Sequence, residues 1–390
     1  MPLISLFALL ATSGCSSGDD GSPVTTGATA ATSTTTAATT TVAATTAPTA
    51  AADDAGDANP GPYPVGVTTL TLPGGAAVEV WYPAAVAPTG DIAYDVRDEV
   101  PPAVREALSG TDVAAGYSFP GTRDAALADG QFPLVLFSHG YSGIRQQSSF
   151  LTSHLASWGM IVAAPEHASR DLSNILAGTA SGDPAEAVGD ILATLDLMTV
   201  AGADRAGPFA GHVDADHVGL VGHSAGGWTV LTAAADPRVD GYVSLASGGP
   251  LDGATYPNTP SLFMAGAIDG VVPVDSVTRP AFAAAPSPSW FVELDATGHN
   301  GFDDFCTFGN GSGIIGLADA SGLGPLLDAQ PQLRTLGQDG CLPPAAPVDE
   351  AFPVIRQATT SFLRTLFGQD TQFVVDGPDA GTVAVTSDAH

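Results

Sequence analysis

The chain has 390 residues, of which 44% are hydrophobic and 7% aromatic, enough to build a large buried core. Its 41 acidic residues outnumber 11 basic ones, all of them arginine, and the formal net charge is −30. A charge of this sign argues against nucleic acid and anionic membrane surfaces as partners. The sequence contains no run approaching the roughly 20 apolar residues of a membrane span.

The N-terminus resembles an export signal. Residues 3–11 form a short apolar segment of the size of a signal-peptide core, and small residues lead from it to Cys15. This arrangement resembles a bacterial lipoprotein cleavage site, so residues 1–15 are expected to be a signal or lipoprotein peptide with a lipid on Cys15. Ordinary secretion without lipid on Cys15 is the alternative. Both place the protein outside the cytoplasm, at the cell surface or free.

Residues 16–59 are expected to be a disordered linker. The stretch 22–52 consists almost entirely of threonine, alanine, serine, valine and glycine, a composition that cannot bury a core. The domain that follows, residues 60–390, alternates short apolar runs with helical patterns. A β-hairpin is predicted over 68–72 and 77–82.

The remaining predicted elements follow in chain order. Strands are expected at 132–137, 160–164, 218–222, 241–246, 261–266 and 290–294, and helices at 100–109, 147–158, 184–200, 228–235 and 349–367. A short strand-like tail is expected within 371–388. Strands that alternate with helices predict an α/β fold with a mostly parallel central sheet and helices on both faces. The active site of such a sheet lies beyond the carboxyl ends of its strands.

The motif Gly222-His-Ser224-Ala-Gly226 stands between a predicted buried strand and a predicted helix. In that context the G-x-S-x-G spacing indicates a nucleophile elbow, a strained turn that exposes the serine hydroxyl. Glycines are needed two residues to either side, because the turn leaves no room there for side chains. Ser224 is therefore the candidate nucleophile.

A serine nucleophile needs a base and an acid that orients the base. Asp269 and His299 each follow a predicted strand, and the order Ser224, Asp269, His299 is that of α/β-hydrolases. Two backbone N–H groups must also stabilise the oxyanion. We expect them at Ala225, after the nucleophile, and at Tyr141, in the loop after strand 132–137.

Other acidic and histidine residues compete for these roles. Asp295, Asp303 and Asp304 lie near His299 in sequence, but each is expected to be a poorer candidate for the acid than Asp269. We expect His139 and His223 to pack structurally. His167 and Glu166 either line the cleft or hold a loop. The spacing of histidine and cysteine matches no metal motif, so no metal site is expected.

Cys306 and Cys341 enclose a long glycine-rich segment just after His299. In an exported protein the two are expected to form a disulfide, whereas two buried free thiols are the alternative.

Several of these stretches together resemble one group of α/β-hydrolases. They are His139-Gly140 after a buried strand, residues 155–167, the motif at 222–227, and residues 299–305. The pattern is similar to the platelet-activating-factor acetylhydrolase and dienelactone-hydrolase-like branch, which is related to bacterial lipases and cutinase-like polyester hydrolases. The resemblance covers about residues 63–310 and the last helix.

The resemblance implies hydrolysis of carboxylic esters, small or lipid-like, by an enzyme without a cofactor, which we expect to be a monomer. A classical dienelactone hydrolase uses a cysteine nucleophile, which disfavours that activity here. Polyester hydrolases often carry methionine after the serine, where this chain has Ala225. Tyr141 and Trp228 could still form an aromatic substrate wall. A polyester or cutin hydrolase is therefore one alternative, and a non-catalytic surface binding protein of the same fold is another.

Overall fold

The computed structural model describes residues 56–250, 254–375 and 383–390. The predictions for the signal peptide, for Cys15 and for most of the linker lie outside the described residues. Contacts divide the chain into residues 1–49 and 50–390, and every described residue belongs to the second unit.

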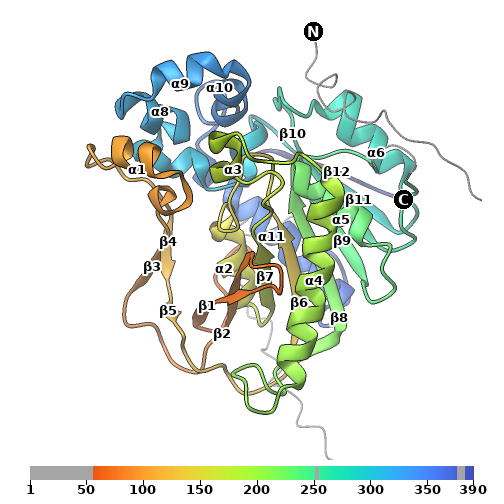
Figure 1. The fold of residues 1–390 in the computed structure, drawn as a ribbon. Helices are drawn as coiled ribbons and strands as arrows, with labels where there is room; N and C mark the ends of the chain where they lie inside the picture. The colour runs from red at the N-terminus through yellow and green to blue at the C-terminus, as the bar shows by residue number, and fades with distance from the viewer. Residues whose placement is uncertain (1–55, 251–253, 376–382) are drawn as a thin grey trace, which may run out of the picture. The chain divides into compact units, whose positions relative to one another are not determined.

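A ten-stranded sheet forms the centre of this unit, in the order β12-β11-β10-β9-β8-β6-β7-β2-β1-β5 (Figure 1). The six strands from β11 to β7 in this order are parallel, and β2 runs antiparallel to both β7 and β1. The strands span Val65–Thr71 (β1), Ala77–Pro83 (β2), Thr122–Arg123 (β5), Phe132–Ser138 (β6), Ile161–Pro165 (β7), Val213–His223 (β8), Gly241–Leu245 (β9), Ser261–Gly266 (β10), Ser289–Leu294 (β11) and Val385–Ala389 (β12). Strands β3 (Asp91–Ala93) and β4 (Ser118–Pro120) pair separately.

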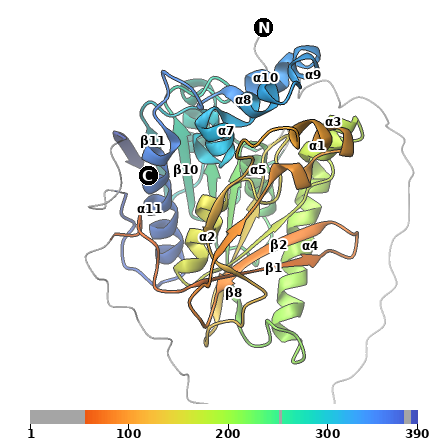
Figure 2. The ribbon, with the colours of Figure 1, turned by 90° about the vertical axis from the view of Figure 1, so that its left-hand side faces the viewer.

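The parallel strands are buried on both faces, which explains their continuous apolar sequences. In β6, Val135 and Phe137 point into one core, and Leu134 and Leu136 point into the other. The first core also contains α2 (Ser149–Ser157) and α11 (Val348–Leu366). The second contains α4 (Pro184–Ala203), α5 (Ala225–Ala233) and α6 (Arg279–Ala284). Figure 2 shows α2 and α11 on one side of the sheet and α4 on the other.

These elements confirm the predicted α/β fold, with its N-terminal hairpin and its helices on both faces. The expected helix at 228–235 begins earlier, at Ala225, directly after the candidate nucleophile. Residues 57–59, assigned from sequence to the linker, pack on the domain: the carbonyl of Asp57 accepts a bond from His154 (2.7 Å) and that of Asn59 one from the Trp158 indole (2.9 Å).

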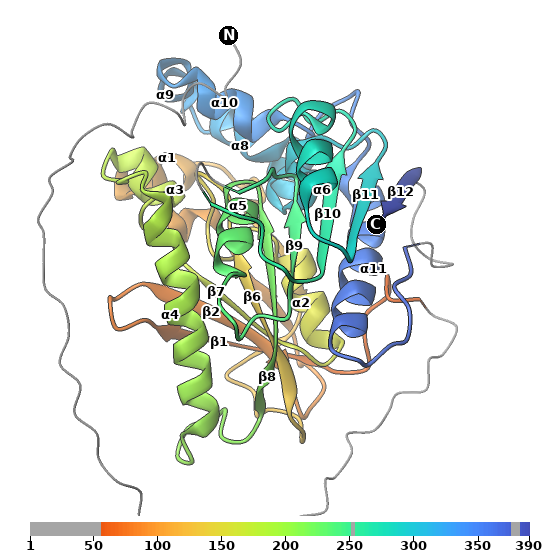
Figure 3. The same cartoon turned by 90° about the vertical axis from the view of Figure 1, so that its right-hand side faces the viewer.

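Several helices lie beyond the strand ends. Helix α1 (Pro102–Leu108) was expected from the sequence. The others were not: they are α3 (Leu172–Ala177) and a series between the two cysteines, α7 (Phe308–Gly311), α8 (Gly313–Ala320), α9 (Gly324–Ala329) and α10 (Pro331–Gln338). Figure 3 shows α8, α9 and α10 above the sheet, with α1 and α3 nearby. We call residues 307–340 the bridged segment, because Cys306 and Cys341 form a disulfide at its two ends. The disulfide expected from sequence is therefore present.

Among the described residues, no helix is both long and apolar enough to cross a membrane.

Candidate active site

Ser224 lies at the turn between β8 and α5, with φ +55° and ψ −120°. A left-handed φ is strained for a serine, and such strain is concentrated at functional sites. The flanking glycines are required by contact: a Cβ at Gly226 would lie 1.9 Å from the carbonyl oxygen of Ser138, and one at Gly222 would lie 2.2 Å from that of Gly226. The local geometry is thus that of a nucleophile elbow.

The side chains of Ser224, His299 and Asp269 form a continuous hydrogen-bonded chain. His299 Nε2 lies 2.9 Å from Ser224 Oγ, and Nδ1 lies 2.8 Å from Asp269 Oδ2. The other oxygen of Asp269 accepts bonds from the backbone N–H groups of Val271 (2.8 Å) and Val272 (2.7 Å). These bonds orient the carboxylate, which in turn favours the imidazole tautomer with a proton on Nδ1 and a lone pair toward the serine.

The electrostatics of His299 favour proton acceptance. Burial by itself lowers the pKa of His299, but the adjacent Asp269 carboxylate, through its charge and its hydrogen bond, and the charge of Asp339 raise it above 6.5 overall. An imidazole that is stabilised in its protonated form is suited to take the proton of an attacking hydroxyl.

The loop after β6 covers the nucleophile. A Cβ at Gly140 would lie 3.3 Å from Ser224 Cβ, so only glycine allows this approach without crowding. The Gly140 N–H is already bonded to Gln147 Oε1 (3.0 Å), so it is not available to an oxyanion. Tyr141, the next residue, lines the same cavity as Ser224, and Ala225 is the first residue of α5.

His223 and Gln147 form a second set of hydrogen bonds at the site, which connects the loops that carry Gly140 and His299 to the elbow. Gln147 Nε2 donates to His223 Nδ1 (2.7 Å), and His223 Nε2 lies 3.1 Å from the carbonyl oxygen of His299. Burial and the nearby His299 lower the pKa of His223 well below 6.5, so it remains neutral. It is buried and bonds to backbone and amide groups, in line with the structural packing expected of it.

Asp339 is part of the site, and sequence analysis did not identify it. Its Oδ1 accepts a hydrogen bond from the backbone N–H of His299 (2.7 Å), and its Oδ2 accepts one from the backbone N–H of Gly270 (3.0 Å). It therefore links the end of the bridged segment to the loops that carry His299 and Asp269. Its distance from both residues in sequence left no signal by which it could have been recognised.

The other acids near His299 have separate contacts. Asp295 is exposed and bonds to the N–H of Ala296. Asp304 accepts bonds from the N–H groups of Ser149 (2.7 Å) and Phe150 (3.2 Å), the first two residues of α2. Asp303 is buried 3.8 Å from His223 Nδ1, and burial raises its pKa well above 3.8. Because these three acids contact other groups, Asp269 is the carboxylate that bonds the His299 ring.

His139 and His167 are buried beneath the Gly140 loop. His139 Nε2 accepts a bond from the His167 N–H (3.0 Å), and His167 bonds Ser138 Oγ (2.9 Å) and Asp190 (3.0 Å). Glu166 pairs with Arg145 at 2.9 Å. His167 and Glu166 therefore hold the loop and do not line the cavity. The described residues contain no cluster of histidine, cysteine and acidic groups that could hold a metal ion.

A large apolar cavity opens beside the nucleophile, with about 870 Å³ of empty space when its open mouth is included. Ser224, His299, Gly140 and Tyr141 line one end of it. Trp228, expected as a second aromatic wall, lies outside this lining; a Cβ at Gly248 would lie 3.1 Å from its indole nitrogen. Residues of the stretches 91–130 and 168–183 contribute to the lining, and the described part of 250–258 does not.

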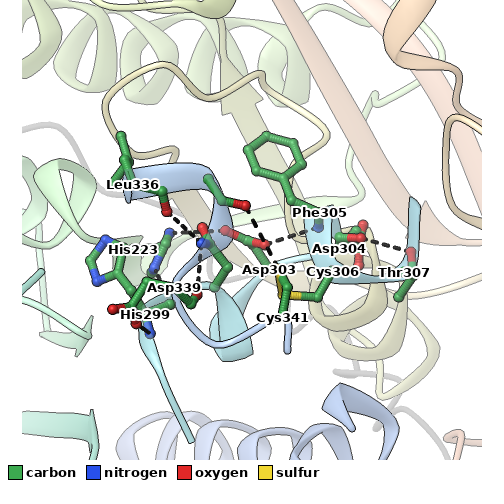
Figure 4. The surroundings of a disulfide bond; sticks show 12 residues. His223, His299, Asp303, Asp304, Phe305, Cys306, Thr307, Leu336, Asp339 and Cys341 are labelled. Carbon is green, nitrogen blue, oxygen red and sulfur yellow. Dashed lines mark hydrogen bonds and ion pairs between the residues drawn. A yellow bond between two sulfur atoms is a disulfide. The ribbon is translucent and has the colours of Figure 1, made fainter. Parts of the chain in front are cut away.

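The disulfide between Cys306 and Cys341 lies close to His299 and Asp339 (Figure 4). Cys306 follows Asp303 and Phe305, which also line the cavity, and Cys341 follows Asp339. Asn300 adds a further link, because its amide donates to the carbonyl oxygens of Leu336 (2.6 Å) and Asp339 (2.8 Å). The start and the end of the bridged segment are thereby held against the His299 loop.

Comparison with known proteins supports the resemblance found in the sequence. A family model described as platelet-activating factor acetylhydrolase, isoform II, matches residues 112–194, which contain β6, α2 and β7 but not Ser224. The bis(hydroxyethyl) terephthalate hydrolase of Streptomyces coelicolor is 26% identical over 236 residues, which is 59% of this chain and 70% of that protein. Both similarities indicate an ester-hydrolysing enzyme with the α/β-hydrolase fold.

Proposed function

We propose that the protein is a serine hydrolase of carboxylic esters that acts through an acyl-enzyme. The observation that carries the proposal is the hydrogen-bonded chain from Ser224 Oγ through His299 to Asp269, beside an apolar cavity. The family and the relative that the chain resembles support the same reaction.

In the first step, Ser224 Oγ forms a bond to the acyl carbon while His299 Nε2 takes the hydroxyl proton. The carbonyl oxygen becomes an oxyanion, which we assign to the backbone N–H groups of Tyr141 and Ala225. The bond to the alcohol then breaks, and His299 returns the proton to the leaving oxygen. A water molecule repeats the sequence on the acyl-enzyme and releases the acid. Asp269 stabilises the imidazolium in both halves.

The test is hydrolysis of p-nitrophenyl acetate by the full chain and by Ser224→Ala, combined with labelling by a fluorophosphonate. We expect the substitution to remove turnover and labelling together. A matched control is Ser321→Ala, a serine in the bridged segment whose hydroxyl bonds the Leu317 carbonyl. If Ser224→Ala retained full activity, the proposal would be wrong. A non-catalytic binding protein would neither turn over the ester nor react with the label.

Hydrolysis of polyester or cutin, or of their ester fragments, is a second candidate. It is favoured by the similarity to a terephthalate-ester hydrolase. Release of terephthalic acid from bis(hydroxyethyl) terephthalate, compared with release of p-nitrophenol from aliphatic esters, separates this candidate from the first.

We further propose that the enzyme is exported and acts as a monomer. The disulfide supports an oxidising compartment, since structural disulfides are rare in the cytosol. We also propose that a lipid attached to Cys15 anchors the exported chain at the cell surface. Mass spectrometry of the purified chain and of Cys15→Ser would detect the lipid as a mass that the substitution removes.

A further inference from the structure

The cavity beside Ser224 has a polar end and an aliphatic body. The polar end consists of Ser224, His299 and their neighbours. The body is formed by helices from three separate parts of the chain, with Val104 and Leu108 from α1, Leu172 and Leu176 from α3, and Leu326 and Leu333 from α9 and α10. A small patch of polar groups at one end of an apolar space is the ordinary design of a binding site for an amphiphilic molecule.

The lining is mostly branched aliphatic side chains. Among the described residues that line it, one is a tyrosine, Tyr141, and one a phenylalanine, Phe305, whereas Trp228 lies outside. Recognition of a planar aromatic ring usually relies on aromatic side chains placed face to face or edge to face with it. This body offers instead a surface of valine, leucine and isoleucine, which suits a hydrocarbon chain.

The wall contributed by the bridged segment is fixed to the catalytic residues. The disulfide joins the two ends of the segment, and Asp339 accepts hydrogen bonds from the backbone N–H groups of both His299 and Gly270. Ile315, Leu327 and Leu333 pack against one another inside the segment and hold its helices together. The aliphatic wall is therefore held at a set position relative to Ser224 Oγ.

From this arrangement we propose that the cleft binds a linear hydrocarbon chain of the ester substrate, with the bridged segment acting as the wall that selects chain length. The inference rests on the proposed function, because it takes Ser224 as the group that attacks the ester carbon. The enzyme then acts on aliphatic esters several carbons long in preference to acetyl esters and to terephthalate esters.

The test is a comparison of kcat/KM along two series of esters with the full chain. One series is p-nitrophenyl esters from acetyl to dodecanoyl, and the other is acetate esters of alcohols from ethanol to dodecanol. We expect kcat/KM to rise about fourfold per methylene in one series until the cleft is full, the gain that burial of one CH₂ group gives. The series that rises identifies whether the acyl or the alcohol chain occupies the cleft.

Two substitutions at lining residues are expected to narrow the cleft, Val104→Trp on α1 and Leu326→Trp on α9. Their matched controls are Ala103→Trp and Ala329→Trp, at exposed positions on the same helices. We expect the first pair to shorten the preferred chain by several carbons, so that kcat/KM for long esters falls relative to kcat/KM for short esters in the same series. The controls should retain the original chain-length profile.

Reaction with a fluorophosphonate shows that a variant is folded and that its Ser224 is reactive. A chain-length profile that is flat in both series, or that the cleft variants and the controls change equally, would overturn the inference. Preference for bis(hydroxyethyl) terephthalate over every aliphatic ester would also overturn it. Activity that survives Ser224→Ala would instead refute the proposed function, so the two failures are distinguishable.

Discussion

The two sides of the cavity at the proposed active site are built on different principles. On one side, Ser224, His299 and Asp269 project from loops after β8, β11 and β10, and each side chain is held by hydrogen bonds of 2.7 to 2.9 Å. On the other side, the bridged segment presents aliphatic side chains whose contacts are apolar packing. The catalytic side depends on exact atoms, because bond making requires fixed donors and acceptors. The aliphatic side depends on volume and surface, which many residues provide.

This difference predicts that single substitutions have very unequal effects on the two sides. On the catalytic side they should reduce the rate for all esters. On the aliphatic side they should alter stability or selectivity and leave the chemistry largely intact.

Replacement of the base should have the largest effect. His299→Gln removes the group that accepts the Ser224 proton, and we expect kcat to fall at least about 10⁴-fold for acetyl and longer esters alike. His217→Gln, at an exposed histidine of β8 paired with Asp214, is the control and should retain full activity. Turnover of p-nitrophenyl acetate by His299→Gln above one-hundredth of the normal rate would contradict the assignment.

Loss of the amide that connects the loops should have an intermediate effect. Gln147→Leu leaves the Gly140 N–H and His223 Nδ1 without their partners. We expect kcat to fall about 10- to 100-fold through displacement of the Gly140 loop, with little change in KM for a short ester. Gln332→Leu, at an exposed position of α10, should have no such effect. An unchanged kcat for Gln147→Leu would show that this connection has no part in positioning the site.

Removal of the disulfide should affect stability more than chemistry. In the chain-entropy model, a bridge over 35 residues contributes about 4 kcal/mol to the free energy of unfolding. We therefore expect Cys306→Ser/Cys341→Ser to unfold at lower denaturant concentration, to flatten the chain-length profile, and to hydrolyse p-nitrophenyl acetate within about tenfold of the normal rate. Cys15→Ser is the control. Equal losses for short and long esters would mean that the bridge supports the catalytic loops alone.

The charge of Asp339 should shift the pH profile by a small amount. In the proposed mechanism only neutral His299 accepts the proton, so we expect activity to fall as the pH drops through the pKa of His299, which its surroundings raise above 6.5. Asp339 contributes to that increase, and Asp339→Asn should move the acid limb of kcat/KM to lower pH by less than about one unit. Asp328→Asn, at an exposed aspartate of α9, should leave the limb in place. A shift to higher pH would contradict the sign of this interaction.

The comparison also explains how far the sequence could predict the site. The glycines at 222 and 226 are identifiable because the turn admits no Cβ there, and the apolar strands are identifiable because both faces of a parallel sheet are buried. Asp269 and His299 could be selected by their positions after predicted strands. The structure brings both of them to Ser224.

The helices of the bridged segment could not be predicted in the same way. They are short and rich in glycine, and α7 to α10 have 4 to 8 residues each, too few for a clear helical period. Asp339 is likewise an ordinary acid after a helix until the disulfide and the loops place it beside His299. Trp228 was expected to form an aromatic substrate wall with Tyr141, but the helix directs its indole toward Gly248.

Local patterns in the sequence predicted the α/β architecture and the elbow at Ser224, because hydrophobic periodicity and backbone sterics act over a few neighbouring residues. Asp269 and His299 were predicted differently, from their positions after strands and their order along the chain. Folding brings α1, α3 and the bridged segment together beside Ser224, where they form the aliphatic cleft. Hydrophobic contact has no direction or partner code, so the residues that share a cavity become known only when the chain is folded.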